Sequence, residues 1–328
     1  MTLAWREVHR IAAAEAARAH RDLGLDTGRR IDPFAALQAA GVVVLRRRVD
    51  RFAGLYLPAD PRLGSPPGVL VNLAHPWSKQ RFTAAHELCH HRRDGAAVLD
   101  LETEWIARGE DGRSDRERTA EAFAAWFLMP APLVQRSLEA LGLRAATLDP
   151  PGAYALALEL GASYAATVRR LADLRLIDEA LRDRLLRVTP WAIKRALGGL
   201  DAAASARRNV WVVRPAQAAR PIWPCAGDAV VVEVPEAPSS GYLWQVAQLS
   251  SGLALVREEY RPDHGDALGG RGTHRFLFRV DAAGRREVRL ELRRPWQPGA
   301  PAESFRVDVA AEPAPGPGIV DPAALLAG

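Results

Sequence analysis

The chain has few of the residues that build disulfide frameworks, and it has no long apolar run. Its 328 residues include two cysteines, Cys89 and Cys225, so the sequence excludes a disulfide-rich scaffold. No run of 18 apolar residues occurs, which argues against a membrane span and a membrane partner. The arginine-bearing N-terminal segment also lacks the apolar centre of a signal peptide. We therefore expect a cytoplasmic protein.

Lysine is scarce as well, since Lys79 and Lys194 are the two lysines and arginine supplies almost all of the positive charge. The formal net charge is +5. Arginine at this level beside so much alanine is typical of a GC-rich coding bias, so the basic balance is weak evidence for nucleic-acid binding. The composition, 48% hydrophobic and 25% charged, is that of a globular protein, and the length predicts about two domains.

One short motif carries chemistry. Residues 86–90 read His-Glu-Leu-Cys-His, an H-E-x-x-H pattern, within an apolar-periodic run over residues 81–91 that predicts a helix. Residues four apart project from one helix face, so His86 and His90 can bind one zinc ion together. Glu87 is then placed to take a proton from water in the open position of the metal. A chance match on a polar helix face is the alternative that these five residues alone leave open.

A second helix can supply the third ligand. The segment from Ser114 to Met129 has a candidate N-cap and apolar residues at helical spacing, and Pro130 ends it. Glu117 and Glu121 share one face of this helix, so one can bind the metal while the other accepts a hydrogen bond from a ligand histidine. A solvated acidic stripe is the alternative.

The first 200 residues otherwise read as mixed α and β. Residues 158–171 have the spacing of a helix-turn-helix, which leaves two interpretations: DNA binding, or a helical subdomain that closes a peptidase cleft. Arg169 and Arg170 are the only basic residues on the would-be recognition helix, so direct DNA binding is the weaker interpretation. We expect strands near residues 41–46, 52–57 and 68–73, and helices over residues 4–23, 34–40, 133–140, 153–160, 164–174 and 178–187.

The C-terminal part has a different texture. After a linker at residues 201–207, polar and apolar residues alternate over residues 275–280, 288–293 and 305–309, as in half-buried antiparallel strands. About seven such strands in roughly 100 residues predict a β-sandwich. The Pro- and Gly-rich residues 312–328 read as a disordered tail.

The motif residues resemble the ImmA/IrrE family of bacterial metallopeptidases. The resemblance covers roughly residues 5–200 and rests on residues 81–90 and 117–130. It implies a gluzincin-like zinc endopeptidase that cleaves helix-turn-helix transcriptional repressors in stress responses or mobile-element control. Thr119-Ala120-Glu121 stands where the family tends to have Glu-Ala-Asn, which leaves Glu117 as the ligand and Glu121 as a replacement for the Asn. The resemblance also implies that the strand at 68–73 borders the cleft and can pair with an extended substrate.

Residues 208–311 resemble the chagasin-type inhibitors of papain-like cysteine peptidases. In that family an immunoglobulin-like sandwich presents three loops that enter the peptidase cleft, so a papain-like peptidase is a further candidate partner. The first loop departs from the family because Ala237 stands for the usual Asn and two serines stand for threonines. The loop residues that we expect to bind a partner are Pro238, Ser239, Ser240, Gly241, Tyr242, Gly269, Gly270, Gly272, Arg294, Pro295 and Trp296.

The predicted fold is an α+β zincin-like metallopeptidase domain with a helical extension, followed by an all-β immunoglobulin-like sandwich. The expected parts are a peptidase core at 1–135, a helix-turn-helix-like subdomain at 136–200, the linker, the sandwich at 208–311 and the tail. The predicted function is zinc-dependent cleavage of a protein regulator, with the sandwich recognising a partner or gating the cleft. Two classes stay open beside it: an inhibitor or docking protein that acts through the sandwich loops, and a DNA-binding regulator.

Overall fold

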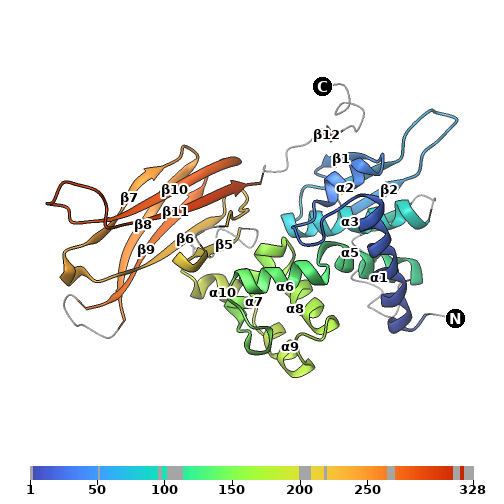
Figure 1. Cartoon of the computed structure of the whole chain (residues 1–328). Coiled ribbons are helices and arrows are strands. Elements are labelled where there is room, and N and C mark those ends of the chain that lie inside the picture. Colours follow the sequence, from blue (N-terminus) through green and yellow to red (C-terminus); the bar gives the residue numbers. More distant parts are fainter. Residues whose placement is uncertain are drawn as a thin grey trace. The chain divides into compact units, whose positions relative to one another are not determined.

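The computed structural model describes residues 3–50, 52–94, 98–101, 114–198, 208–217, 220–263, 270–312 and 318–320 (Figure 1). Contacts divide the chain into two compact units. The first consists of residues 1–138, 160–182 and 315–328, and the second of residues 139–159 and 183–314. The helices of the predicted helical subdomain are thus divided between the units, and the predicted linker at 201–207 lies outside the described residues.

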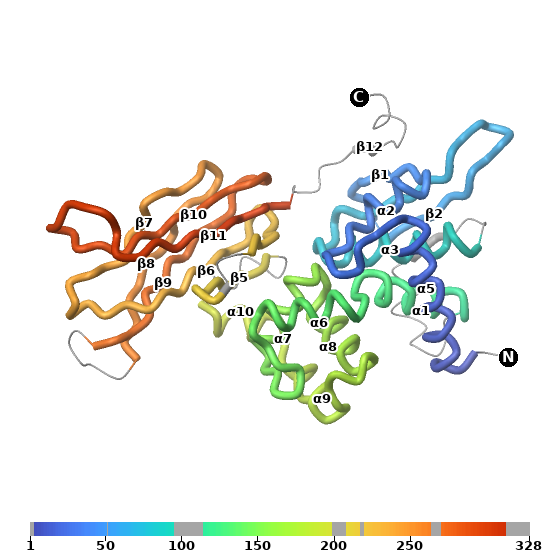
Figure 2. Tube along the Cα trace, in the orientation of Figure 1, coloured from blue at the N-terminus to red at the C-terminus, as the bar shows by residue number. Residues whose placement is uncertain are grey.

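The first unit contains a five-stranded sheet in the order β12-β1-β3-β2-β4. Strands β1 and β3 are parallel and the other neighbours are antiparallel. The hairpin between β2 and β3 extends away from the sheet (Figure 2). The strands are β1 (Val43–Arg47), β2 (Phe52–Leu57), β3 (Gly68–Asn72), β4 (Val98–Leu101) and β12 (Gly318–Val320).

Two expectations about this sheet are corrected. The strand β3, expected to accept a substrate strand, is paired with β1 on one side and with β2 on the other, so its backbone groups already have partners. The strand at the edge of the sheet on this side is β4, which follows β2 in the strand order. The tail, expected to be disordered throughout residues 312–328, includes β12, which pairs with the outer edge of β1 and satisfies its backbone hydrogen bonds.

In the first unit α5 (Asp115–Leu128) packs on both α1 (Trp5–Asp22) and α3 (Trp77–Arg93), and α3 also packs on β2 and β3. Small residues on α1, among them Ala12 and Ala16, are buried and allow close approach to α5. Ser114 caps α5 by accepting a hydrogen bond from the backbone N–H of Glu117, as predicted. The unit also contains α2 (Pro33–Ala39) and α8 (Tyr164–Asp173), and α6 (Ala131–Ala140) and α9 (Glu179–Leu186) each contain a point where the chain passes between units.

The second unit is rich in β-structure, with one four-stranded sheet in the order β5-β6-β9-β8 and one three-stranded sheet in the order β11-β10-β7. The strands are β5 (Val210–Val213), β6 (Ala229–Glu236), β7 (Leu243–Leu249), β8 (Leu253–Pro262), β9 (Gly272–Val280), β10 (Gly284–Arg293) and β11 (Glu303–Ala311). The helices α7 (Pro150–Leu160) and α10 (Pro190–Ala196) belong largely to the same unit.

The predicted alternation is confirmed for β10, where Val288 and Leu290 are buried and their neighbours are more exposed. It is wrong for β9, where Phe276 and Leu277 on opposite faces are both buried. The second face of this sheet is covered because Leu197, which follows α10, packs against the buried cluster that contains Leu277. Among the helices that the structure describes, none combines the length and the apolar character needed to cross a bilayer.

Candidate metal centre

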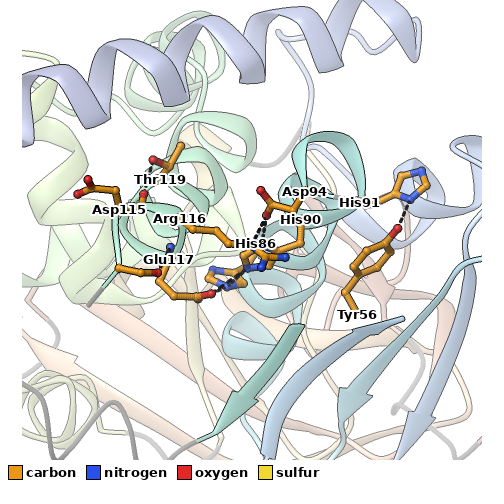
Figure 3. A network of polar contacts seen from close by, with 10 residues as sticks. Tyr56, His86, His90, His91, Asp94, Asp115, Arg116, Glu117 and Thr119 are labelled. Atoms are coloured by element: carbon orange, nitrogen blue, oxygen red, sulfur yellow. Dashed lines mark hydrogen bonds and ion pairs between the residues drawn. The ribbon is translucent and has the colours of Figure 1, made fainter. Parts of the chain in front are cut away.

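The two motif histidines and one glutamate of the next helix converge in the first unit. His86 and His90 lie one turn apart on α3, and their Nε2 atoms are 2.9 Å apart. Glu117 reaches them from α5, with Oε2 3.2 Å from Nε2 of His86 and Oε1 3.5 Å from Nε2 of His90 (Figure 3). The structure therefore brings together the three residues that the sequence analysis assigned as metal ligands.

These atoms fit the donor set of a zinc ion. Metal–ligand distances of about 2.0–2.1 Å in a tetrahedron require ligand atoms about 3.3 Å apart. The two imidazole nitrogens are 2.9 Å apart, and they lie 3.2 and 3.5 Å from the two different oxygens of Glu117, all close to that value. Two imidazoles and one carboxylate leave one tetrahedral position for water or a substrate atom, as catalytic zinc sites require.

Burial and charge make the three residues strongly interdependent. The side chains of His86 and His90 are almost fully buried, whereas that of Glu117 is 28% exposed. Burial acts to raise the pKa of Glu117, but hydrogen bonds from the two histidines outweigh it, so the pKa lies well below its ordinary value. Burial acts to lower the pKa of His86, and the bond to Glu117 and the charge of Glu87 outweigh it, so that pKa is raised. Glu117 is therefore ionised, as a ligand must be.

Asp94, which the sequence analysis missed, contacts the second histidine from the other side. Nδ1 of His90 donates a hydrogen bond to Oδ2 of Asp94 at 2.5 Å. Because a carboxylate only accepts, Nδ1 carries a proton, so loss of the proton on Nε2 would leave the neutral tautomer whose Nε2 lone pair can bind a metal. Arg116 of α5 forms an ion pair of 2.7 Å with the same Asp94 oxygen. The sequence signal was a carboxylate four residues after His90, at the C-cap of α3.

The role given to Glu121 stays a prediction. Glu121 lies on α5 one turn after Glu117 and is partly buried. The histidine–carboxylate bond of the kind predicted for Glu121 is made at His90 by Asp94. Nδ1 of His86 has no hydrogen-bond partner among the residues that the structure describes.

The other polar residues of α3 serve different purposes. Glu87 follows the first histidine and is fully buried beside it. Cys89 is 2% exposed, and burial raises the pKa of its thiol, which fits a packed and unreactive cysteine. The hydroxyl of Tyr56 and Nδ1 of His91 lie 3.2 Å apart, and these side chains point toward one another and away from Glu117 (Figure 3).

The predicted recognition helix has little surface for DNA. On α8, Val168, Arg170 and Leu171 are buried, and the guanidinium of Arg170 lies 3.7 Å from the ring centroid of Trp126. Nε of Arg170 also donates to the carbonyl oxygen of Met129. Arg170 is thus a packing residue, and Arg169 remains as the single exposed arginine of the pair. A single phosphate contact gives little affinity, which disfavours the DNA-binding alternative.

In the second unit, two of the three predicted loops lie against each other. The guanidinium of Arg294 lies 4.5 Å from the ring centroid of Tyr242, and its Nη2 donates to the carbonyl oxygen of Ser240. A Cβ atom on Gly241 would lie 2.9 Å from the ring of Trp296, so the absence of a side chain there lets the indole approach. Trp296 is nevertheless 70% exposed.

The third predicted loop is only partly described. The register of β6 and β9 places Gly272, where this loop ends and β9 begins, opposite Glu236, which lies just before the first loop. Gly270 accepts a hydrogen bond from the hydroxyl of Tyr260. Gly269 lies outside the described residues. The partner-binding role of the loops, including Pro238, Ser239 and Pro295, stays a prediction.

Comparisons with known proteins agree with both resemblances. A family model described as the IrrE N-terminal-like domain matches residues 37–172, and one described as the chagasin family peptidase inhibitor I42 matches residues 225–309. Chagasin from Trypanosoma cruzi is 31% identical over 87 residues, which cover 25% of this chain and 79% of chagasin.

Two solved structures each align with about a third of the chain. One is a cysteine protease inhibitor of Entamoeba histolytica, EhICP2, with 16% identity over 33% of this chain and 100% of that protein, at a TM-score of 0.30. The other is PbICP-C in complex with falcipain-2, with 14% identity over 33% of this chain and 93% of the inhibitor, at a TM-score of 0.24.

Proposed function

The chain belongs to the chagasin family through residues 225–309 and carries an IrrE N-terminal-like domain at residues 37–172, and on that premise we propose that it is a zinc-dependent endopeptidase with a partner-binding β-domain. The observation that carries the proposal is the convergence of His86, His90 and Glu117 on one point within the IrrE-like domain. The proposal places the enzyme among the gluzincins, with two histidines of one helix and a glutamate of the next as ligands.

In this proposal His86, His90 and Glu117 hold the zinc ion. When bound, zinc supplies Lewis-acid polarisation of water and of the scissile carbonyl group. Glu87, adjacent to the first ligand on α3, accepts the proton of the attacking water and passes it to the departing amine. Asp94, itself held by the ion pair with Arg116, orients the His90 ring by accepting the hydrogen bond from Nδ1. Glu121 is the candidate acceptor of a hydrogen bond from the other ligand histidine, His86.

The proposed substrate is a helix-turn-helix transcriptional repressor. Support comes from the similarity of residues 37–172 to the IrrE-like family. A repressor acts where the DNA is, so the proposal also places the protein in the cytoplasm, in a stress response or in control of a mobile element. The β-domain, proposed to be an immunoglobulin-like sandwich, would select the partner or gate the cleft through its loops.

The test uses the full chain with zinc and a genetically adjacent helix-turn-helix protein as the probe. Glu87→Gln should retain zinc and fold and lose about 10²–10⁴-fold in cleavage rate, because the base is removed while the ligands remain. Glu7→Gln, at a partly exposed glutamate of α1, is the matched control and should cleave normally. Full activity of Glu87→Gln would remove this residue from the mechanism, and wild-type protein that takes up no zinc would refute the proposal as a whole.

A second candidate function is inhibition of, or docking to, a papain-like cysteine peptidase. It is supported by the exposed Trp296 and the stacked pair of Arg294 and Tyr242 on adjoining loops. The two functions are separable because binding of papain should survive Glu87→Gln, whereas repressor cleavage should not. Proteolysis abolished in Glu87→Gln would identify the peptidase, and papain binding without any proteolysis would identify the inhibitor.

A further inference from the structure

A glycine of the neighbouring strand lies directly against the Glu87 carboxylate. If Gly54 of β2 carried a Cβ atom, that atom would lie 2.5 Å from Oε1 of Glu87 and 2.4 Å from Cγ2 of Thr83. Real Cβ atoms keep at least 3.0 Å, and 3.4 Å or more is ordinary contact. The carboxylate therefore occupies space that exists only because residue 54 has no side chain.

The backbone does not need a glycine at this position. Gly54 is not among the glycines with φ in the left-handed region, so an alanine could adopt its conformation. The strand cannot retreat either, because Gly54 pairs with Val71 of β3 on one side and with Asp100 of β4 on the other. The β2–β4 register shifts between Phe52 and Gly54, an irregularity of the kind that re-aims residues beside functional sites. The reason for glycine at residue 54 is therefore that a side chain would collide with Thr83 and Glu87.

We propose that Gly54 is a positioning residue that sets the place of the Glu87 carboxylate beside the metal centre. This inference rests on the proposed peptidase function, since it assigns Gly54 a role through the proposed general base. The sheet is held by its pairing and Glu87 is fully buried, so a methyl group at residue 54 is accommodated by moving both the carboxylate and the Thr83 methyl group. An increase from 2.5 Å to at least 3.4 Å moves that oxygen by about 1 Å, a displacement that can cost about 10²-fold in rate.

The matched control is a glycine on the adjacent strand. A Cβ atom on Gly68 of β3 would meet only the backbone oxygen of Val43, at 3.8 Å, which is ordinary contact. Gly54→Ala and Gly68→Ala thus add the same methyl group to neighbouring strands of one sheet, and only the first is aimed at Glu87. Glu87→Gln supplies the size of the loss when the base itself is removed.

The experiment compares these full-length variants for zinc content, for cleavage of the probe repressor and for the Glu87 position in crystal structures. Gly54→Ala should bind zinc as the wild type does, keep KM, lose about 10–10²-fold in kcat and show the carboxylate displaced. Gly68→Ala should match the wild type in every measurement. A Gly54→Ala enzyme with wild-type kcat, or with its carboxylate in the wild-type position, would overturn the inference. If the wild type binds zinc and cleaves nothing, the proposed peptidase function fails. The crystal structures of wild type and Gly54→Ala would still show whether Gly54 sets the position of the Glu87 carboxylate.

Thermal unfolding covers the case in which Gly54→Ala is poorly folded. The loss in Tm caused by Gly54→Ala should shrink in a Glu87→Ala background, because the atom that opposes the new methyl group is gone. The loss should shrink only in part in a Thr83→Ser background, because that change removes the 2.4 Å contact and leaves the contact with the carboxylate. Relief by Thr83→Ser and not by Glu87→Ala would show that Gly54 accommodates the helix α3 and not the carboxylate.

Discussion

Asp94 holds the Nδ1 proton of His90 through a hydrogen bond of 2.5 Å, and the opposite nitrogen of the same ring faces His86 and Glu117. The imidazole is therefore fixed in the tautomer that can donate its Nε2 lone pair to a metal. Arg116 and Glu117 are neighbours on α5, so the ion pair between Arg116 and Asp94 connects Asp94 to the helix that carries Glu117. One carboxylate thus links the orientation of a histidine on α3 to the position of the third ligand on α5.

Removal of this carboxylate should weaken zinc binding. Asp94→Ala is expected to lower zinc affinity by about 10–100-fold, because His90 loses the acceptor that sets its tautomer and ring orientation. The measurement is competition with a chromogenic chelator. Asp22→Ala is the control, since Asp22 forms an ion pair with Arg92 of α3 and does not touch either histidine. Equal affinities of the two variants would show that Asp94 is structural only.

The third ligand can be distinguished from its neighbour on the same helix face. Glu117→Gln should lose zinc under conditions in which the wild type is saturated, because a neutral amide replaces the ionised ligand. Glu121→Gln should keep zinc with at most a modest loss of affinity, in line with a supporting role. Metal content after dialysis measures both. A Glu121→Gln protein that loses zinc while Glu117→Gln keeps it would reverse the assignment.

The sequence predicted most elements of the fold because local signals dominate them. The strand at 52–57 has the predicted bounds, and the helix at 164–174 differs by one residue from α8, which begins after the Ser163 cap. The metal helix begins at Trp77, four residues earlier than predicted, because Pro76 and not a polar residue precedes it. β4 and β12 were not predicted, since each is only a few residues long and gains its strand conformation from pairing with β2 or β1.

The site was predictable as far as spacing determines it. Two histidines four apart on a helix must share a face, so His86 and His90 followed from the motif alone. Asp94 has the same i, i+4 relationship to His90, but its role depends on the ring orientation, which a sequence pattern does not contain. The proximity of Gly54 and Glu87 depends on how α3 packs on β2, which is a tertiary relationship. The burial of Arg170 on Trp126 has the same origin, and it removed one of the two arginines expected to face DNA.

His20 should make the protein less stable in mild acid. Its ring is 7% exposed, stacks on Phe127 and donates from Nε2 to the Phe127 carbonyl oxygen. Burial lowers the pKa of His20 below 6.5, and the backbone hydrogen bond opposes this only in part. As pH falls below 6.5, the unfolded chain takes up a proton that the native state refuses, so stability decreases until the lowered folded pKa is reached.

The variant His20→Gln keeps a side-chain N–H donor and cannot titrate. Its unfolding free energy should fall less steeply between pH 7 and pH 5 than that of the wild type, where one proton contributes a slope of up to about 1.4 kcal/mol per pH unit. Urea denaturation at a series of pH values measures the slope. His9→Gln, at a partly exposed position of the same helix, is the control. Identical slopes for wild type and His20→Gln would show that His20 does not titrate differently in the two states.

The loops of the β-domain should bind through their aromatic and arginine residues. Trp296 is 70% exposed, and Gly241 leaves the space in which its ring lies. Exposed tryptophans at the centre of an interface dominate binding energy, so Trp296→Ala should weaken binding of papain to the full chain by at least about 30-fold. Gly241→Ala should have a similar effect, because a Cβ atom there would strain the backbone at φ +77° and push the indole away.

Trp191→Ala, at a 49% exposed tryptophan of α10, is the control. Calorimetric titration with active-site-blocked papain measures each affinity, and equal affinities of Trp296→Ala and wild type would exclude this loop from the contact. A wild-type chain that does not bind papain would restrict the loops to the recognition or gating role in the peptidase itself.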